Sequence, residues 1–181
     1  MDKDGFITFT KYFKYLGSFI SFILNDDHDI AERIKKANQS MGALKCFWDA
    51  KEVDLRSKFL IYNTIPISLL LWGSKRWALT KVFIKKLEVF HLRNIRRILG
   101  IKRSEVIDDK IKNKQVLEKI CDIHYIACYI SKRRLTFIGR IIRIKNDRVP
   151  ARLISAFIYE KRPVGRPNFS TRHLYISDIK K

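Results

Sequence analysis

Apolar residues follow a strand-like pattern near the N-terminus of this chain and a helical spacing of three and four residues after it. The segment from Phe6 to Ile23 is dominated by Phe, Tyr, Ile and Thr, with two lysines and Gly17 interrupting it. Aromatic and β-branched residues favour strands. The pattern therefore predicts a short β-hairpin within residues 1–25.

The first predicted helix follows the polar cluster Asn25-Asp26-Asp27-His28-Asp29. We expect Asp29 to be its N-cap, with Glu32 three residues later completing a capping box. The apolar residues after this cap keep to one helical face for about four turns. They are Ile30, Ile34, Ala37, Met41 and Leu44.

A second, shorter helix is predicted from Asp54, with Leu55, Phe59 and Tyr62 facing inward. The longest apolar stretch, Ile61 to Trp72, follows it and contains Pro66. This stretch is too short and too often interrupted by polar residues to cross a bilayer. It is therefore interpreted as buried core.

The third helix has the clearest signals in the chain. Thr80 is the expected N-cap, and Gly100 followed by Ile101 predicts a Schellman ending. The residues expected to face inward are Ile84, Leu87, His91, Ile95 and Ile98. The opposite side carries Lys86, Arg93 and Arg97.

The remaining sequence predicts a lysine-containing loop with a short helix over residues 102–119 and a long helix over residues 116–145. One side of that helix is expected to carry Cys121, His124, Cys128, Leu135, Ile138 and Ile142. The other side carries Lys132, Arg133, Arg140 and Arg143. The chain is therefore predicted to be mainly α, with a hairpin (1–25), two helical regions (26–101 and 102–162) and an irregular basic tail (163–181).

The charge balance points to a polyanionic partner. The 181 residues contain 38 Lys and Arg against 18 Asp and Glu, for a net charge of +20. Residues 1–50 are neutral, residues 51–100 carry +8 and residues 101–181 carry +12. The binding face is therefore expected in the C-terminal two thirds, and DNA, RNA or an RNA–DNA hybrid is the expected partner.

Three cysteines and an N-terminus without a basic and apolar leader favour an intracellular protein, with the nucleus included, over a secreted one. No membrane association is expected.

Three groups of residues were weighed as chemical sites, and each has a structural explanation that we prefer. The cluster at residues 26–29 resembles a carboxylate–imidazole metal site, but a turn and helix cap use the same residues. Asp108 and Asp109 resemble the paired aspartates that hold two magnesium ions in polymerases, but the lysines around them suit a solvated loop. Cys121, His124 and Cys128, with His91 as a fourth ligand, match no compact zinc module and suit core packing instead. No catalytic residue, metal or cofactor is predicted.

The basic helical faces are the stronger signal, because they lack the interleaved Glu residues of ordinary surface helices. Like charges repel, and a polyanion would relieve that repulsion. Nucleic-acid contact is therefore preferred over an inert charged surface.

The residues also resemble, in order and spacing, the region downstream of the polymerase core in non-LTR (LINE-type) retrotransposon reverse transcriptases. The similarity extends over roughly residues 12–167. It rests on Phe13 to Ser18, Leu70 to Lys81, Leu87 to Ile101, Arg133 to Arg143 and Gly165 to Pro167.

This resemblance implies a hairpin that grips the primer end, here Tyr15, Leu16 and Gly17. The helices of residues 26–101 would then be thumb-like and those of residues 102–162 a basic linker. The catalytic palm that binds magnesium would precede this hairpin and is absent from the chain. The predicted nucleic-acid-binding residues are Lys14, Tyr15, Leu16, Gly17, Lys86, Arg93, Arg96, Arg97, Lys132, Arg133, Arg140, Arg143 and Arg166.

The predicted function is therefore that of a reverse transcriptase fragment that binds template–primer nucleic acid. Apolar surface facing the missing palm, including Phe6, Phe9 and Phe19, would support self-association. Two alternatives stay open. The chain is a thumb completed by a palm outside it, or it is an RNA-binding or interaction module unrelated to retroelements.

Overall fold

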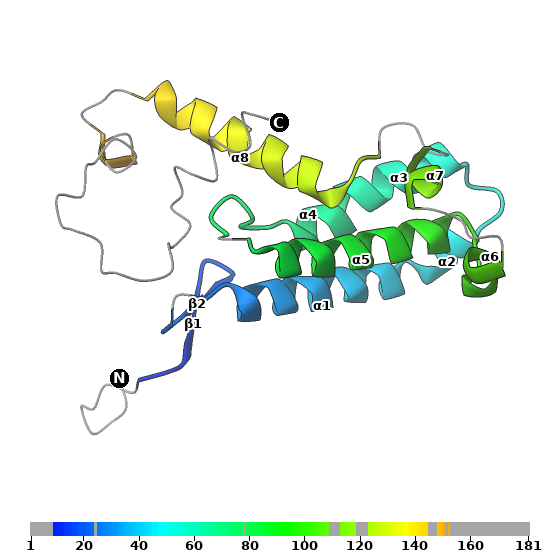
Figure 1. The fold of residues 1–181 in the computed structure, drawn as a ribbon, viewed down its shortest axis with the longest axis horizontal. Helices are drawn as coiled ribbons and strands as arrows, with labels where there is room; N and C mark the ends of the chain where they lie inside the picture. The colour runs from blue at the N-terminus through cyan, green and yellow to red at the C-terminus, as the bar shows by residue number, and fades with distance from the viewer. Residues whose placement is uncertain are drawn as a thin grey trace.

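The computed structural model describes residues 9–23, 25–77, 79–108, 113–118, 123–144, 148–150 and 152. It is mainly helical, with an N-terminal antiparallel hairpin followed by helices (Figure 1). The predicted fold class is thus confirmed. The elements are β1 (Tyr12–Tyr15), β2 (Ser18–Ser21), α1 (Asp27–Ala43), α2 (Lys45–Asp49), α3 (Leu55–Thr64), α4 (Pro66–Leu70), α5 (Lys81–Ile98), α6 (Arg103–Asp108), α7 (Asn113–Glu118) and α8 (Ile126–Ile142).

The hairpin has a two-residue turn. Tyr15 pairs with Ser18, and the turn residues Leu16 and Gly17 have φ angles of 46° and 80°. Positive φ at both central positions is the type I′ geometry, whose twist matches that of the flanking strands. Glycine adopts this conformation readily, whereas leucine does so at a cost.

Three predicted helix signals are confirmed. The Asp54 side chain accepts a hydrogen bond from the Ser57 backbone at 3.1 Å, and Thr80 Oγ1 accepts one from Phe83 at 3.4 Å. Gly100 has a φ of 71°, and the Ile101 N–H donates to the Arg96 carbonyl at 2.9 Å, which completes the Schellman motif.

The predicted start of the first helix is wrong. The N-cap is Asp26, and Asp29 is 1% exposed within the first turn. The sequence does not distinguish a cap from the role that Asp29 has here. A carboxylate in the first turn of a helix can accept hydrogen bonds either from N–H groups of its own helix or from donors elsewhere in the fold. Here the donors come from β2 and from residues 76 and 77.

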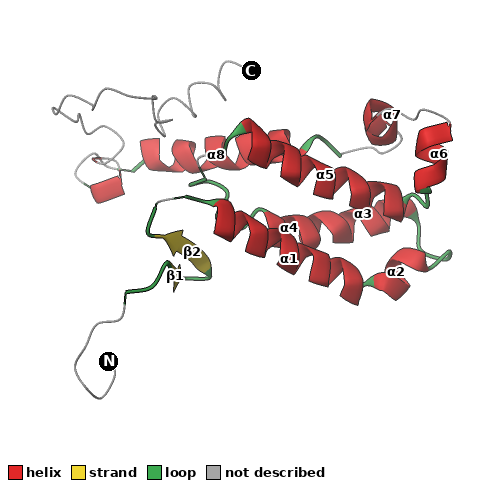
Figure 2. Ribbon diagram, turned by 60° about the horizontal axis from the view of Figure 1, so that its bottom comes forward, coloured by secondary structure: helices red, strands yellow, loops and turns green. Residues whose placement is uncertain are grey.

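The core lies among α1, α3, α4 and α5 (Figure 2). Residues Ile30, Ala37 and Met41 of α1 are buried, as predicted, and Ile34 and Leu44 are partly buried.

The other predicted inward faces are largely confirmed. The predicted inward residues Phe59 and Tyr62 of α3 are buried, but Leu55 is 49% exposed. Along α5, Leu87, His91, Ile95 and Ile98 are buried, and Ile84 packs at the edge of the core. Ile67, Leu70 and Leu71 confirm the apolar stretch as core, although Trp72 at its end is 57% exposed.

The predicted long helix over residues 116–145 is wrong in extent and orientation. α7 ends at Glu118, residues 123–125 are not helical, and α8 begins at Ile126. The buried residues of α8 are Ile126, Ile130, Arg134 and Ile141. His124, Cys128 and Ile142, which we expected inside, are exposed, and Cys121 lies outside the described residues. Apolar residues occur on several sides of this helix, so their spacing alone does not select one face.

Among the described helices, none combines the length and hydrophobicity that a bilayer span requires. The two cysteines that the structure describes, Cys46 and Cys128, are free and exposed.

Candidate nucleic-acid interface

The connection of residues 71–77, which follows α4 along the chain, lies in contact with both the hairpin and the helices. Gly73 has a φ of 78°, and a Cβ placed on it would lie 3.1 Å from Ser18 Oγ. The same construction on Gly17 comes within 3.9 Å of Trp72 Nε1. Glycine at position 73 thus lets the 71–77 connection approach the hairpin closely, whereas the contact at Gly17 has an ordinary van der Waals distance.

Asp29 holds this junction together. Its carboxylate accepts hydrogen bonds from the Phe19 backbone N–H at 3.0 Å and from Trp77 Nε1 at 3.0 Å. It also pairs with Arg76 at 3.3 Å and with Arg33 at 3.7 Å. Burial lowers the pKa of Arg33, while the nearby Asp29 charge opposes that shift. Buried charges require such partners, so Asp29 fixes the hairpin on α1.

α8 attaches to the other side of the same connection. Arg133 donates to the Leu71 carbonyl at 3.0 Å, and Arg134 donates to the Trp77 carbonyl at 2.8 Å. Lys75 Nζ lies 5.3 Å from the ring centroid of Phe137. Burial lowers the pKa of Arg133. Arg133 was predicted on the outer face, but it is half-buried because its guanidinium reaches inward to this carbonyl.

The hairpin turn, the 71–77 connection and α8 therefore meet, and each of these segments carries exposed cations or aromatic rings. Figure 1 shows the course of the three segments. The predicted residues Tyr15 and Leu16 are 56% and 79% exposed, and Trp72 is 57% exposed beside them. We call the following set of exposed residues the hairpin–α8 surface: Tyr15, Leu16, Trp72, Lys75, Lys132 and Arg140. The predicted residue Lys14 is also exposed, but it lies on the face of the hairpin opposite to Tyr15, because consecutive residues of a strand point to opposite faces. Lysine and arginine bind phosphates, and exposed aromatic rings stack on bases.

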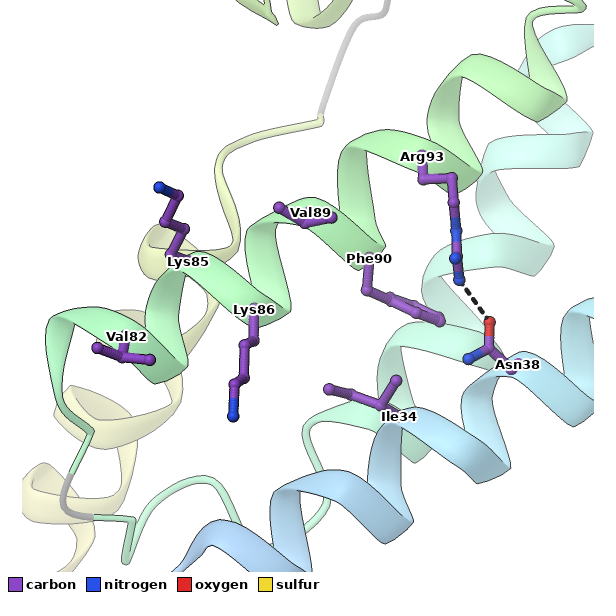
Figure 3. A pocket seen from close by; sticks show the side chains of 8 residues that line it. All are labelled: Ile34, Asn38, Val82, Lys85, Lys86, Val89, Phe90 and Arg93. Carbon is purple, nitrogen blue, oxygen red and sulfur yellow. Dashed lines mark hydrogen bonds between the residues drawn. The ribbon is translucent and has the colours of Figure 1, made fainter. Parts of the chain in front are cut away.

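Three of the four predicted cations of α5 contact residues of α1 or α7. Lys86 and Arg93 line a groove between α5 and α1, where Lys86 is 3.9 Å from Asp27 and Arg93 donates to Asn38 at 2.9 Å (Figure 3). Arg96 donates to Asn113. Arg97 and, beyond the end of α8, Arg143 are exposed.

The structure thus places the predicted residues that it describes on the hairpin, on α5 and on or just after α8. Gly17 is half-buried in the hairpin turn, and Arg166 lies outside the described residues. Sequence reasoning did not select Trp72, Lys75 or Arg134 as site residues. The run Trp-Gly-Ser-Lys-Arg-Trp at residues 72–77, where an aromatic residue precedes glycine and two cations, was the available signal.

The residues weighed as metal ligands have structural roles. His28 stacks on Tyr12 with ring centroids 4.1 Å apart. His91 is fully buried and forms hydrogen bonds with the Tyr62 hydroxyl and the His124 carbonyl, which confirms the core interpretation for His91. That interpretation is wrong for His124 and Cys128, which are exposed. In the part of the chain that the structure describes, no group of three or more His, Cys, Asp or Glu side chains is placed to hold a metal ion. Asp109 lies outside that part.

No protein-family model matches the chain, and no curated protein or solved structure is significantly similar to it.

Proposed function

We propose that this chain binds template–primer nucleic acid through the hairpin–α8 surface, as the thumb and linker region of a non-LTR-type reverse transcriptase would. The observation that carries the proposal is that the hairpin turn, the 71–77 connection and α8 meet and together carry three exposed cations and the exposed rings of Tyr15 and Trp72, on a chain of net charge +20. Cations on this surface would contact the phosphates. The two rings would lie against the unpaired base at a strand end.

The cations favour binding that is tolerant of sequence, because phosphate contacts carry no base information. If six phosphates are engaged, the affinity should fall roughly a thousandfold between about 50 and 200 mM salt. A flat response to salt would contradict the proposal.

The experiment is a fluorescence titration of the full chain with a labelled primer–template junction and with a blunt duplex of the same length. The double variant K132A/R140A should lower the salt slope by about two, because it removes two phosphate contacts. The matched control is K51A/R56A, which removes the same charge from exposed residues near α2 and the start of α3, at the opposite end of the bundle (Figure 1). Equal losses in the two variants would show that only net charge matters and would overturn the assigned surface.

Tyr15→Ser tests the strand-end contact. We expect it to reduce the preference for the junction over the duplex while leaving duplex affinity within about twofold. A primer-extension reaction with magnesium, run beside the titration, separates this proposal from its alternatives. Nucleotide incorporation would favour an active polymerase, and selective binding of one folded RNA would favour an unrelated RNA-binding module.

A further inference from the structure

A groove runs between α1 and α5, and none of its lining residues belongs to the hairpin–α8 surface. The two helices run in the same direction, since Asp27 and Asn38 of α1 lie opposite Lys86 and Arg93 of α5, respectively. The groove has a volume of about 480 Å³. It is lined by Ile34, Asn38, Val82, Lys85, Lys86, Val89, Phe90 and Arg93 (Figure 3).

The groove contains two largely exposed apolar side chains of α5, which is unusual for a surface helix. Val82 and Val89 are 62% and 58% exposed and lie two turns apart on the same side of α5. Phe90 is buried at 3% exposure, and Ile34 is half-buried at the edge of the core, so both form the floor. From Val82 to Arg93 the groove follows α5 for about 16 Å, at a helical rise of roughly 1.5 Å per residue. That length accepts about three turns of another helix.

The polar side chains that line the groove are mostly positively charged. Lys85 and Lys86 are exposed, and Arg93 extends across the groove to Asn38 with its guanidinium carbon 6.0 Å from the Phe90 ring centroid. Among the residues that the structure describes, the one acidic partner of these cations is Asp27, 3.9 Å from Lys86, and more than half of each of those two side chains is exposed. Exposed pairs of this kind contribute little stability, so an incoming carboxylate can replace Asp27 at low cost.

We propose that this groove binds an acidic amphipathic helix of a partner protein. The apolar residues of that helix would cover Val82 and Val89, and its Glu or Asp residues would pair with Lys85, Lys86 and Arg93. Anchors at spacings of three, four and seven residues match this mode of recognition. The proposal goes beyond nucleic-acid binding and does not depend on it.

Two other occupants fit less well. A nucleic-acid strand would pair its phosphates with the cations but would leave the valines against its charged backbone, and the one ring in the groove, Phe90, is too buried to stack on a base. A second copy of this chain would bring together two molecules of charge +20.

The test uses the full chain and a fluorescein-labelled synthetic 16-residue helix with leucine at positions i, i+3, i+4 and i+7 and glutamate on the flanks. We expect saturable binding that weakens at least tenfold in V82T/V89T, because this change removes apolar surface without altering charge or shape greatly. The variant K85Q/K86Q/R93Q should weaken binding and reduce its dependence on salt. Both sets of side chains are largely exposed, and the circular dichroism spectrum checks that the fold is kept. Control peptides with glutamine for glutamate, or serine for leucine, should each bind at least tenfold more weakly.

Peptide binding that is unchanged in V82T/V89T would overturn the proposal. So would displacement of the peptide by an unlabelled oligonucleotide whose own binding needs Lys85, Lys86 and Arg93 but not the valines, since the groove would then be a nucleic-acid site. Sedimentation that shows a dimer lost in V82T/V89T would assign the groove to self-association instead.

Discussion

The carboxylate of Asp29 accepts a hydrogen bond of 3.0 Å from the indole nitrogen of Trp77, 48 positions further along the chain. Both side chains are buried, at 1% and 0% exposure. Since Asp29 also binds the Phe19 backbone and pairs with Arg33 and Arg76, one carboxylate joins β2, α1 and the 71–77 connection. The position of the hairpin thus depends on a single buried charge.

We therefore expect Asp29→Asn to lower the free energy of unfolding by about 3 kcal/mol. The amide keeps the shape of the side chain but leaves the buried Arg33 guanidinium without its counter-charge. Urea denaturation measures the loss. The matched control is Asp27→Asn, two residues earlier and exposed, which should cost less than about 1 kcal/mol. Equal losses of stability in the two variants would show that the buried charge of Asp29 does not hold the hairpin in place.

His91 should make the fold sensitive to mild acid. Burial lowers the pKa of His91 to about 4, with the hydrogen bond to His124 opposing the shift. Its Nε2 must donate to the His124 carbonyl at 3.0 Å, so Nδ1 accepts from the Tyr62 hydroxyl at 2.9 Å. The neutral ring is therefore the form that the fold holds.

The pKa of His91 is lower in the folded state than the usual value of 6.5. The stability that the neutral ring contributes is therefore complete above pH 6.5 and is lost as the pH falls toward 4. We expect about 2 kcal/mol of stability to be lost between pH 7 and about pH 5, measured by urea denaturation at each pH. His91→Phe should be less stable at pH 7 but should remove most of this slope. A slope unchanged in that variant would contradict the assignment.

The ionisation of Glu88 has the opposite effect on the pH dependence of stability. Burial raises the pKa of Glu88, although its hydrogen bond from the Ile126 N–H at 2.9 Å opposes the shift. A raised pKa gives stability that is present at low pH and lost as the pH rises through the folded-state value. Glu88→Gln keeps an acceptor for Ile126, so we expect it to match or exceed the wild-type stability at pH 7, by up to about 1 kcal/mol, and to lose that advantage below pH 4. Denaturation of both proteins across this range measures the difference.

Leu16 occupies a backbone conformation that disfavours its side chain. Its φ is 46° and its side chain is 79% exposed, so little packing compensates the cost. We expect Leu16→Asn to stabilise the hairpin by about 1 kcal/mol, seen as slower amide hydrogen exchange in β1 and β2. Leu16→Ala keeps the same backbone penalty and should change stability by less than about 0.5 kcal/mol. If alanine stabilises as much as asparagine, the turn is not the cause.

Two glycines should respond to alanine with opposite signs. Gly100 has a φ of 71°, whereas Gly139 lies inside α8, and a Cβ at either position meets no atom within 4 Å. Gly100→Ala should therefore cost about 1–2 kcal/mol through the backbone alone. Gly139→Ala should stabilise the helix by up to about 1 kcal/mol. Thermal denaturation of the two variants distinguishes the signs.

The hairpin–α8 surface was predictable only in part. Tyr15, Lys132 and Arg140 are predicted from the sequence and are exposed on the hairpin and on α8, which both contact the 71–77 connection. Trp72 was assigned to the core because it ends an apolar stretch, but it lies on the surface beside Gly17. The side chain of Arg133 was assigned to the surface because charged residues are normally solvated, yet it is half-buried against the Leu71 carbonyl.

The sequence by itself determined the hairpin, the ends of α3 and α5 near Asp54, Thr80 and Gly100, and the inward face of α5. These features depend on hydrogen bonds and side-chain spacings within a few positions, so the residues that specify them are neighbours in the chain. Only the tertiary structure decided the role of Asp29 and the direction of Arg133 and Arg134. Their hydrogen-bond partners lie 48, 62 and 57 positions away, and a buried charge takes the orientation of whichever donors or carbonyls the fold brings beside it.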